Sequence, residues 1–261
     1  MSGFIRRNIL IKIFKLTREA KIKQLELKKV AYDCANKILS GQFWQQPYKH
    51  LIVDNFLPED LARRCLESFP SMKDDVWQHE NDKEIEVKSR TMWQSEFDIP
   101  EDVIDAVRLL NSSLIMKAFS TMFDIHKLVP DPYFTGGGLN VTQRGGLLDV
   151  HIDGNYHDAT GLNRRMNAII YLNPEWKESW GGEFGIYNND GTTLIKKVPP
   201  LFNRLVVFDS HDKSWHGLPN PINFPKDQPR KSIILYYYTK EKRPEKYRIP
   251  TDATPAMDFP K

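Results

Sequence analysis

The stretch Arg204-Leu-Val-Val-Phe-Asp-Ser-His-Asp-Lys-Ser-Trp-His216 sets the pattern of the second half of the chain. Its first residues form an apolar run of the length and β-branched content typical of a buried strand; a polar turn follows, and a second short strand begins. Short apolar runs and turn residues alternate in the same way on both sides of this stretch. The pattern predicts strands over residues 139–142, 147–152, 167–172, 183–187, 193–197, 204–208, 215–218 and 232–238.

The segments between these strands decide the class of fold. They are short and rich in glycine, asparagine and proline, so no helix can be placed between consecutive strands. This excludes a doubly wound parallel sheet, in which helices connect the strands. Strands at this spacing, preceded by helices, predict an α+β fold that is mainly β: a double-stranded β-helix, or jelly roll, with supporting N-terminal helices.

Upstream of these strands the pattern is mixed. We expect a strand at 48–56, amphipathic helices at 58–69 and 101–124, and a polar solvated loop at 71–100, with a lid over a site as the alternative interpretation. The chain of 261 residues is long enough for one large domain or two small ones. We divide it into a basic amphipathic helical segment (1–45), a strand-helix entry with supporting helices (46–131), the jelly-roll core (132–240) and a C-terminal tail (241–261).

Charge is distributed unevenly along the chain. Residues 1–40 contain ten Lys or Arg against three acidic residues, a balance of +7, whereas the whole chain carries +3. The segment is too charged to span a bilayer and does not resemble a signal peptide. It predicts a helix packed on the domain, with weak contact to a membrane surface or a partner as the alternative.

Cys34 and Cys65 stand apart from any C-x-x-C pair, which favours reduced thiols and a cytoplasmic location.

Two histidines and one carboxylate are the candidate metal ligands. His151 and Asp153 are two residues apart on a predicted strand and therefore share a face. His216 lies on a later strand; we prefer it to His211, which falls in the polar turn, while Asp149 is a rival carboxylate on the face of Asp153. Two histidines and one carboxylate leave three coordination positions open, the arrangement of oxygen-activating iron centres. A closed structural site would need four ligands.

A basic residue stands at the entry to the last predicted strand. Arg230 enters a run of apolar and aromatic residues, where a buried arginine requires an anionic partner. Lys231 is the neighbouring cation, but the alternation of a strand directs it to the opposite face. The strand therefore predicts a buried anion as the partner of Arg230.

Taken in order and spacing, these elements resemble the iron(II)- and 2-oxoglutarate-dependent dioxygenases, specifically the prolyl-4-hydroxylase-like branch. The resemblance covers roughly residues 132–238, with a similar entry at 51–69. The elements that carry it are His151-x-Asp153, Tyr171-Leu-Asn173, Gly181-Gly-Glu-Phe184, Arg204-Leu-Val-Val-Phe208, His216 and Arg230.

The resemblance implies a role for each of these residues. His151, Asp153 and His216 would hold Fe(II), and Arg230 would bind the distal carboxylate of 2-oxoglutarate, with Ser232 and Tyr171 as hydroxyl donors. Tyr171 is equally well interpreted as a core aromatic residue. With O₂ as oxidant and ascorbate as a candidate reductant, the reaction implied is hydroxylation of an aliphatic carbon with release of succinate and CO₂.

Two positions narrow the chemistry further. Asp153 stands where related halogenases have a small residue, and this favours hydroxylation as the reaction. Tyr236 stands where the related alkylation-repair enzymes have a second arginine, and this disfavours nucleic acid as the substrate. The substrate class stays open between a prolyl or other amino-acid residue, a free amino acid and a sugar-linked small molecule. His157 and Asn155 are expected to be surface loop residues or, alternatively, substrate contacts. The competing hypothesis is a non-catalytic jelly-roll protein with a binding or scaffold role.

Overall fold

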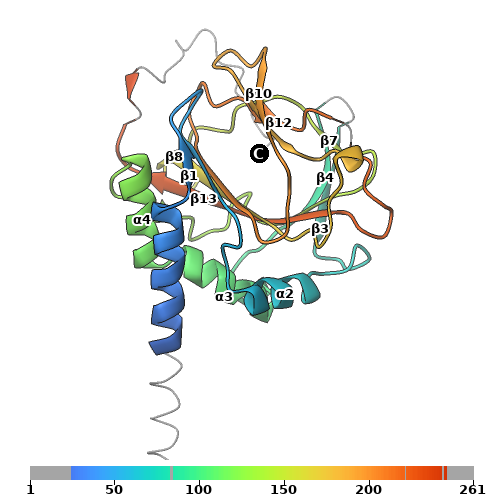
Figure 1. Cartoon of the computed structure of the whole chain (residues 1–261), viewed down its shortest axis with the longest axis horizontal. Helices are drawn as coiled ribbons and strands as arrows, with labels where there is room; N and C mark the ends of the chain where they lie inside the picture. Colours follow the sequence, from blue (N-terminus) through green and yellow to red (C-terminus); the bar gives the residue numbers. More distant parts are fainter. Residues whose placement is uncertain (1–24, 83–84, 221, 243, 246–261) are drawn as a thin grey trace, which may run out of the picture.

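Two antiparallel sheets form the framework of the protein. The computed structural model describes residues 25–82, 85–220, 222–242 and 244–245 (Figure 1). The path of the large sheet runs β1 (Gln42–Trp44), β2 (His50–Val53), β11 (Leu205–Asp209), β8 (Asn163–Tyr171), β13 (Arg230–Thr239), β6 (Gly138–Thr142), β4 (Glu86–Thr91) and β3 (Trp77–Asp82). Two short strands lie off this path, β5 (Val129–Pro130) beside β13 and β7 (Leu147–Leu148) beside β4. The small sheet is ordered β10 (Leu194–Val198), β9 (Phe184–Tyr187) and β12 (His216–Gly217).

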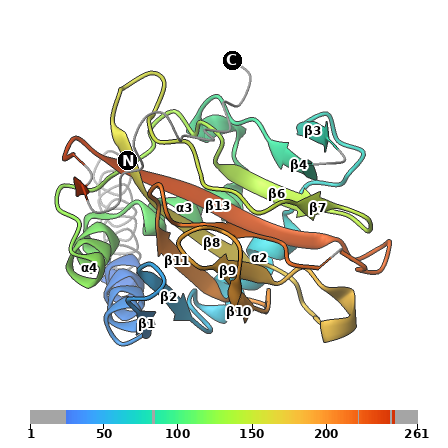
Figure 2. The same ribbon diagram turned by 90° about the horizontal axis from the view of Figure 1, so that it is seen from above.

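Helices cover one face of the large sheet (Figures 1 and 2). They are a helix over residues 25–39, α2 (Glu59–Glu67), α3 (Glu101–Leu110) and α4 (Ser113–Phe123). Two single-turn 3-10 helices, η1 (Glu96–Asp98) and η2 (Glu178–Trp180), lie in connections. The main apolar core is packed between these helices and the sheet. The described residues therefore form the α+β, mainly β architecture that the sequence predicts.

The central strands β8 and β13 have two different faces, because successive side chains of a strand point in opposite directions. On β13, Ile233, Leu235 and Tyr237 belong to the helix-side core. The alternate residues of the same strand, Arg230, Ile234 and Tyr236, line a pocket on the other face. β8 follows the same rule, with Met166, Ala168 and Ile170 in the helix-side core and Asn167 and Ile169 at the pocket. One face of the sheet thus packs on the helices, and the other carries the pocket beside a smaller apolar cluster.

The polar segment at 71–100 differs from the prediction. It contains the antiparallel pair β3 and β4, and β4 continues the large sheet next to β6. Its side chains lack an apolar alternation because most of them face solvent or the polar pocket rather than a core. The prediction of an irregular loop over the whole segment was therefore wrong.

Two other predicted elements are shorter than expected. The helix predicted at 101–124 is two helices, since Asn111 ends α3 and the Ser112 hydroxyl accepts a hydrogen bond from the Ile115 N–H at the start of α4. The strand predicted at 147–152 pairs regularly only to Leu148, so His151 and Asp153 lie beyond it.

The two middle segments of the predicted division share one sheet, whereas the two terminal segments lie mostly outside the described residues. Strands from 46–131 and from 132–240 pair within the same sheet, β2 with β11 and β4 with β6. Most of the basic stretch at 1–40 and most of the tail at 241–261 lie outside the described residues. None of the helices in the described part of the chain has both the length and the apolar character needed to cross a bilayer.

Candidate metal centre

A short backbone bridge brings the two candidate histidines together. His151 and His216 form an isolated antiparallel bridge, in which the backbone carbonyl of each residue accepts a hydrogen bond from the backbone N–H of the other at 2.9 Å. Their rings, 4.4 Å apart between centroids, lie on the same side of this bridge. The bridge explains how residues from distant parts of the chain meet, since it joins the segment after β7 to the start of β12.

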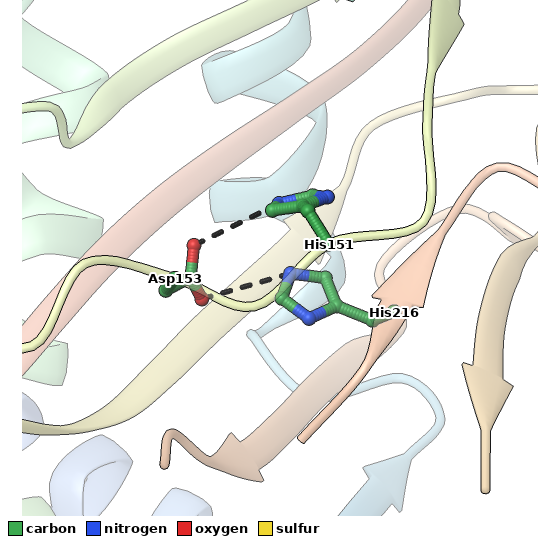
Figure 3. Close-up of side chains that lie close together, drawn as sticks. All are labelled: His151, Asp153 and His216. Carbon is green, nitrogen blue, oxygen red and sulfur yellow. Dashed lines mark ion pairs between the residues drawn. The ribbon is translucent and has the colours of Figure 1, made fainter. Parts of the chain in front are cut away.

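Asp153 faces both histidines (Figure 3). Its Oδ1 lies 3.9 Å from His151 Nε2, and its Oδ2 lies 3.6 Å from His216 Nε2. One ligand atom from each of the three residues lies within 4.8 Å of the others. The structure thus brings together the three residues chosen from the sequence, at separations that a single metal ion can bridge.

Backbone carbonyls set the protonation of both imidazoles. His151 Nδ1 lies 2.7 Å from the Asp149 carbonyl, and His216 Nδ1 lies 2.9 Å from that of Ser214. A carbonyl only accepts hydrogen bonds, so each Nδ1 carries the proton and each Nε2 presents its lone pair to Asp153. Burial, followed by the nearby ring of His151, lowers the pKa of His216 to about 4. A neutral imidazole with a free Nε2 is the form that binds a metal.

Asp153 is held as a carboxylate. Burial alone would raise its pKa, but Arg164, the two histidines and Asn167 together hold the pKa well below its usual range. Arg164 Nη1 lies 3.7 Å from Oδ1, and Asn167 Nδ2 donates to Oδ2 at 2.6 Å. A buried anion with these partners is ready to receive a cation.

Arg230 begins β13 on the pocket face, and it is buried. Its Nε donates to the Gly182 carbonyl at 2.8 Å, and Nη2 donates to the Tyr171 hydroxyl at 3.2 Å. Arg230 forms no ion pair within the described part of the chain. Burial raises the pKa of Tyr171, so its hydroxyl keeps a proton that it can donate to another acceptor.

Ser232 supplies a further polar group on the same face of β13. Its side chain is fully buried, and its Oγ has no hydrogen-bond partner among the described residues. Its neighbours across the strands are Tyr171 on β8 and Asn140 on β6. A buried cation without a carboxylate and a buried hydroxyl without a partner fit an organic acid bound at this point.

The pocket connects these two groups of residues. Its volume is about 620 Å³, the open solvent at its mouth included, and it is lined by His151, Asp153, His216 and Arg230 together with residues of β4, β6, β8 and β13. Lys88 of β4 also lines it and forms an ion pair with Glu86. The metal ligands and Arg230 therefore open into one cavity.

The rival candidates lie elsewhere. The His211 Nδ1 accepts the Lys213 N–H, and the residue is not part of the metal cluster. Asp149 contributes its backbone carbonyl to His151, while its carboxylate accepts the Val150 N–H. Lys231 lies over the ring of Phe69 on the helix side, as alternation requires.

His157 differs from both interpretations given above. It is buried, and its Nε2 is hydrogen-bonded to Asp131 Oδ1 at 2.9 Å. Its Nδ1 accepts the N–H groups of Ala159 and Thr160. It therefore fixes the fold of its own loop, rather than lying exposed on the surface.

Arg164 and Asn167 were missed as site residues because they lie on β8, far from the metal motif. The one signal that could have found them is the run Asn163-Arg-Arg-Met-Asn167, whose buried polar residues break the apolar pattern of a central strand. Polar residues at such positions require a buried partner; Asp153 is the partner of Arg164 and Asn167.

Part of the chain matches a known family. Residues 137–238 match the 2OG-Fe(II) oxygenase superfamily, and the match includes all three candidate ligands and Arg230. This segment of the chain is therefore similar to that superfamily. The chain is also similar to prolyl 3-hydroxylase OGFOD1 of Xenopus laevis (36% identity over 64 residues, 23% of this chain) and of Mus musculus (29% over 86 residues, 31% of this chain). The matched segments span 12% and 15% of the length of these relatives.

Solved structures of oxygenases share the fold. One is a prolyl hydroxylase from Trichoplax adhaerens in complex with a peptide fragment of hypoxia inducible factor. It has a TM-score of 0.60 and 17% sequence identity, and the alignment covers 83% of this chain and 93% of that chain. Another is a prolyl-4-hydroxylase from Pseudomonas putida, with a TM-score of 0.53 and 17% sequence identity. The alignment covers 80% of this chain and 99% of that chain. The predicted jelly roll is thereby confirmed.

Proposed function

We propose that this protein is a 2OG-Fe(II) oxygenase, a hydroxylase that uses Fe(II), 2-oxoglutarate and O₂ and acts on a prolyl or other amino-acid residue of a peptide. The observation that supports this proposal most strongly is the metal-ligand cluster. In it, His151 Nε2, His216 Nε2 and a carboxylate oxygen of Asp153 face one another in a pocket that Arg230 also lines. The prolyl hydroxylase relatives and structural neighbours support a peptide substrate. A free amino acid or another small molecule is the broader alternative.

His151, Asp153 and His216 would hold Fe(II). Arg230, with Tyr171 and Ser232 beside it, would bind the far carboxylate of 2-oxoglutarate and orient its keto acid end towards the metal ligands. The bound metal and 2-oxo acid would activate O₂, the oxidant: one oxygen atom would enter succinate as CO₂ leaves, and the other would convert a C–H bond of the substrate into C–OH. Ile169, Phe184 and Phe208 line the pocket and limit the access of water.

A cytoplasmic location and ascorbate as reductant are parts of the same proposal. Cys34 and Cys65 are both free and buried, as expected of a protein in a reducing compartment. A membrane or partner contact through residues 1–40 stays a prediction.

The metal site is tested by anaerobic titration with Fe(II) and 2-oxoglutarate, followed by exposure to O₂. We expect a metal-to-ligand charge-transfer band and release of succinate. His216→Ala should abolish both, whereas His211→Ala, a buried histidine outside the cluster, should retain the band. A band that survives His216→Ala would contradict the assignment, and no metal binding at all would favour the non-catalytic hypothesis.

The substrate class is tested with a library of proline-containing peptides. The expected result is a mass increase of one oxygen atom on a prolyl residue, dependent on 2-oxoglutarate and absent with His216→Ala. Oxidation of free amino acids without oxidation of any peptide would contradict the peptide substrate and leave the hydroxylase assignment intact.

A further inference from the structure

Asn167 touches the metal carboxylate from the centre of the sheet. It lies on β8 and lines the pocket, and its Nδ2 donates to Asp153 Oδ2 at 2.6 Å. Its Oδ1 is buried without a hydrogen-bond partner. The contact with a carboxylate fixes the orientation of the amide, because the reverse orientation would bring two oxygen acceptors together.

The two oxygens of Asp153 are consequently different. Oδ2 accepts the short hydrogen bond from Asn167. Oδ1 lies 3.7 Å from Arg164 Nη1 and 3.9 Å from His151 Nε2, both longer than a hydrogen bond. Oδ1 is therefore the less restrained of the two.

The surroundings of Asn167 keep it in place. Its neighbours across the strands are Phe208 on β11 and Tyr236 on β13, and both line the pocket. The guanidinium of Arg164 lies over the Tyr236 ring, 3.5 Å from its centroid. The amide is thus confined by packed rings on either side, as a residue that positions another must be.

The number of carboxylate oxygens on a metal decides how many positions are left for other ligands. Two histidines and a carboxylate bound through one oxygen leave three positions on a six-coordinate ion. A carboxylate bound through both oxygens takes one of these. A chelating 2-oxo acid takes two more, so nothing would remain for O₂.

We propose that Asn167 is a positioning residue that keeps Asp153 a one-oxygen ligand by occupying Oδ2, and so preserves the position that O₂ needs. This inference rests on the metal site of the proposed function, and not on the identity of the substrate. Asn167 acts through Asp153 and has no part in the reaction itself.

Mn(II) and water-proton relaxation test this without turnover, because the relaxation reports water molecules bound to the metal. With Mn(II) alone, Asn167→Leu should lower the bound-water contribution by about one third relative to the unchanged protein. With Mn(II) and 2-oxoglutarate, it should fall from one bound water to none. Asn167→Gln, which retains the amide donor, should restore the bound water.

Two further variants make the result specific. Asn140→Leu makes the same change at another buried asparagine of the pocket, whose Nδ2 bonds the Gly138 carbonyl; with Mn(II) alone it should leave the bound water unchanged. Asn167→Val, a residue suited to a strand, replaces Asn167→Leu if that variant does not fold. Equal bound water in the unchanged protein and either apolar variant at position 167 would overturn the inference. Failure of the unchanged protein to bind Mn(II) would instead contradict the proposed metal site.

Discussion

Adjacent residues on β13 show how strongly a single position determines a role. Arg230 points into the pocket, with its guanidinium fixed by the Gly182 carbonyl and the Tyr171 hydroxyl. Lys231, the next residue, points to the helix side and lies over Phe69. The strand alternation predicted this difference from the sequence, because it depends only on the period of two. The partners of Arg230 could not be predicted in the same way, because they come from other elements.

Replacing Arg230 with lysine should weaken binding of 2-oxoglutarate. Arg230→Lys keeps the positive charge but loses the planar fork and the Nε contact with Gly182. We expect the dissociation constant for 2-oxoglutarate, measured by calorimetry with Mn(II), to rise roughly 10- to 100-fold, or about 1.4–2.8 kcal/mol. Mn(II) affinity should not change. Arg204→Lys, the same replacement in the half-buried pair with Asp54, is the control; an equal effect in the two variants would contradict a specific role for Arg230.

His50 should make the stability of the fold depend on pH. Burial lowers its pKa from 6.5 to about 4, against a raising effect of the hydrogen bond to the Tyr48 carbonyl, and the charge of Lys196 lowers it further. Between these two pH values the unfolded chain binds a proton that the folded chain does not. The free energy of unfolding should therefore decrease as the pH falls from about 6.5 to about 4, by a few kcal/mol at most. Urea unfolding of His50→Asn should show a smaller decrease over this window; the same pH dependence in both proteins would contradict the assignment.

At the scale of elements, regular strands were easier to predict than the segments that carry the site. The apolar runs of β8, β11 and β13 were found because burial on both faces leaves a clear signal. The pair β3 and β4 was missed because its polar composition resembles that of a loop. The bridge between His151 and His216 lies outside regular strands, so no periodic pattern could predict that these two residues pair. The roles of Arg164 and Asn167 depend on their register and on a loop, which local sequence does not encode.

The turn before β9 should affect ligand binding through Arg230. Gly182 has φ +79°, and a Cβ there would lie 2.8 Å from the Phe224 ring and 3.1 Å from Arg230 Cδ. Gly182→Ala should therefore displace the guanidinium and raise the dissociation constant for 2-oxoglutarate about tenfold or more. Gly161→Ala is a matched control, since Gly161 has φ +66° with no atom within 4 Å of its Cβ. Calorimetry that finds the two variants equal would exclude the steric explanation.

At the scale of the whole molecule, most of the stability should come from the core between the helices and the large sheet. Phe119 of α4 is fully buried there, with its ring centroid 5.6 Å from that of Tyr237 on β13. Phe119→Ala should lower the free energy of unfolding by about 3–5 kcal/mol, as judged by urea denaturation. The exposed Lys117→Ala on the same helix should change it by less than about 0.5 kcal/mol. A loss below about 1 kcal/mol for Phe119→Ala would mean that this layer contributes little.

The two faces of β13 have a consequence for protein engineering. The even-numbered positions 230, 232, 234 and 236 reach the pocket side, while Ile233, Leu235 and Tyr237 reach the helices. A mutant library confined to Ile234 and Tyr236 would vary the wall that a new substrate meets and leave the opposite layer intact. Selection for altered specificity and selection for heat resistance can therefore draw on separate sets of positions within one strand.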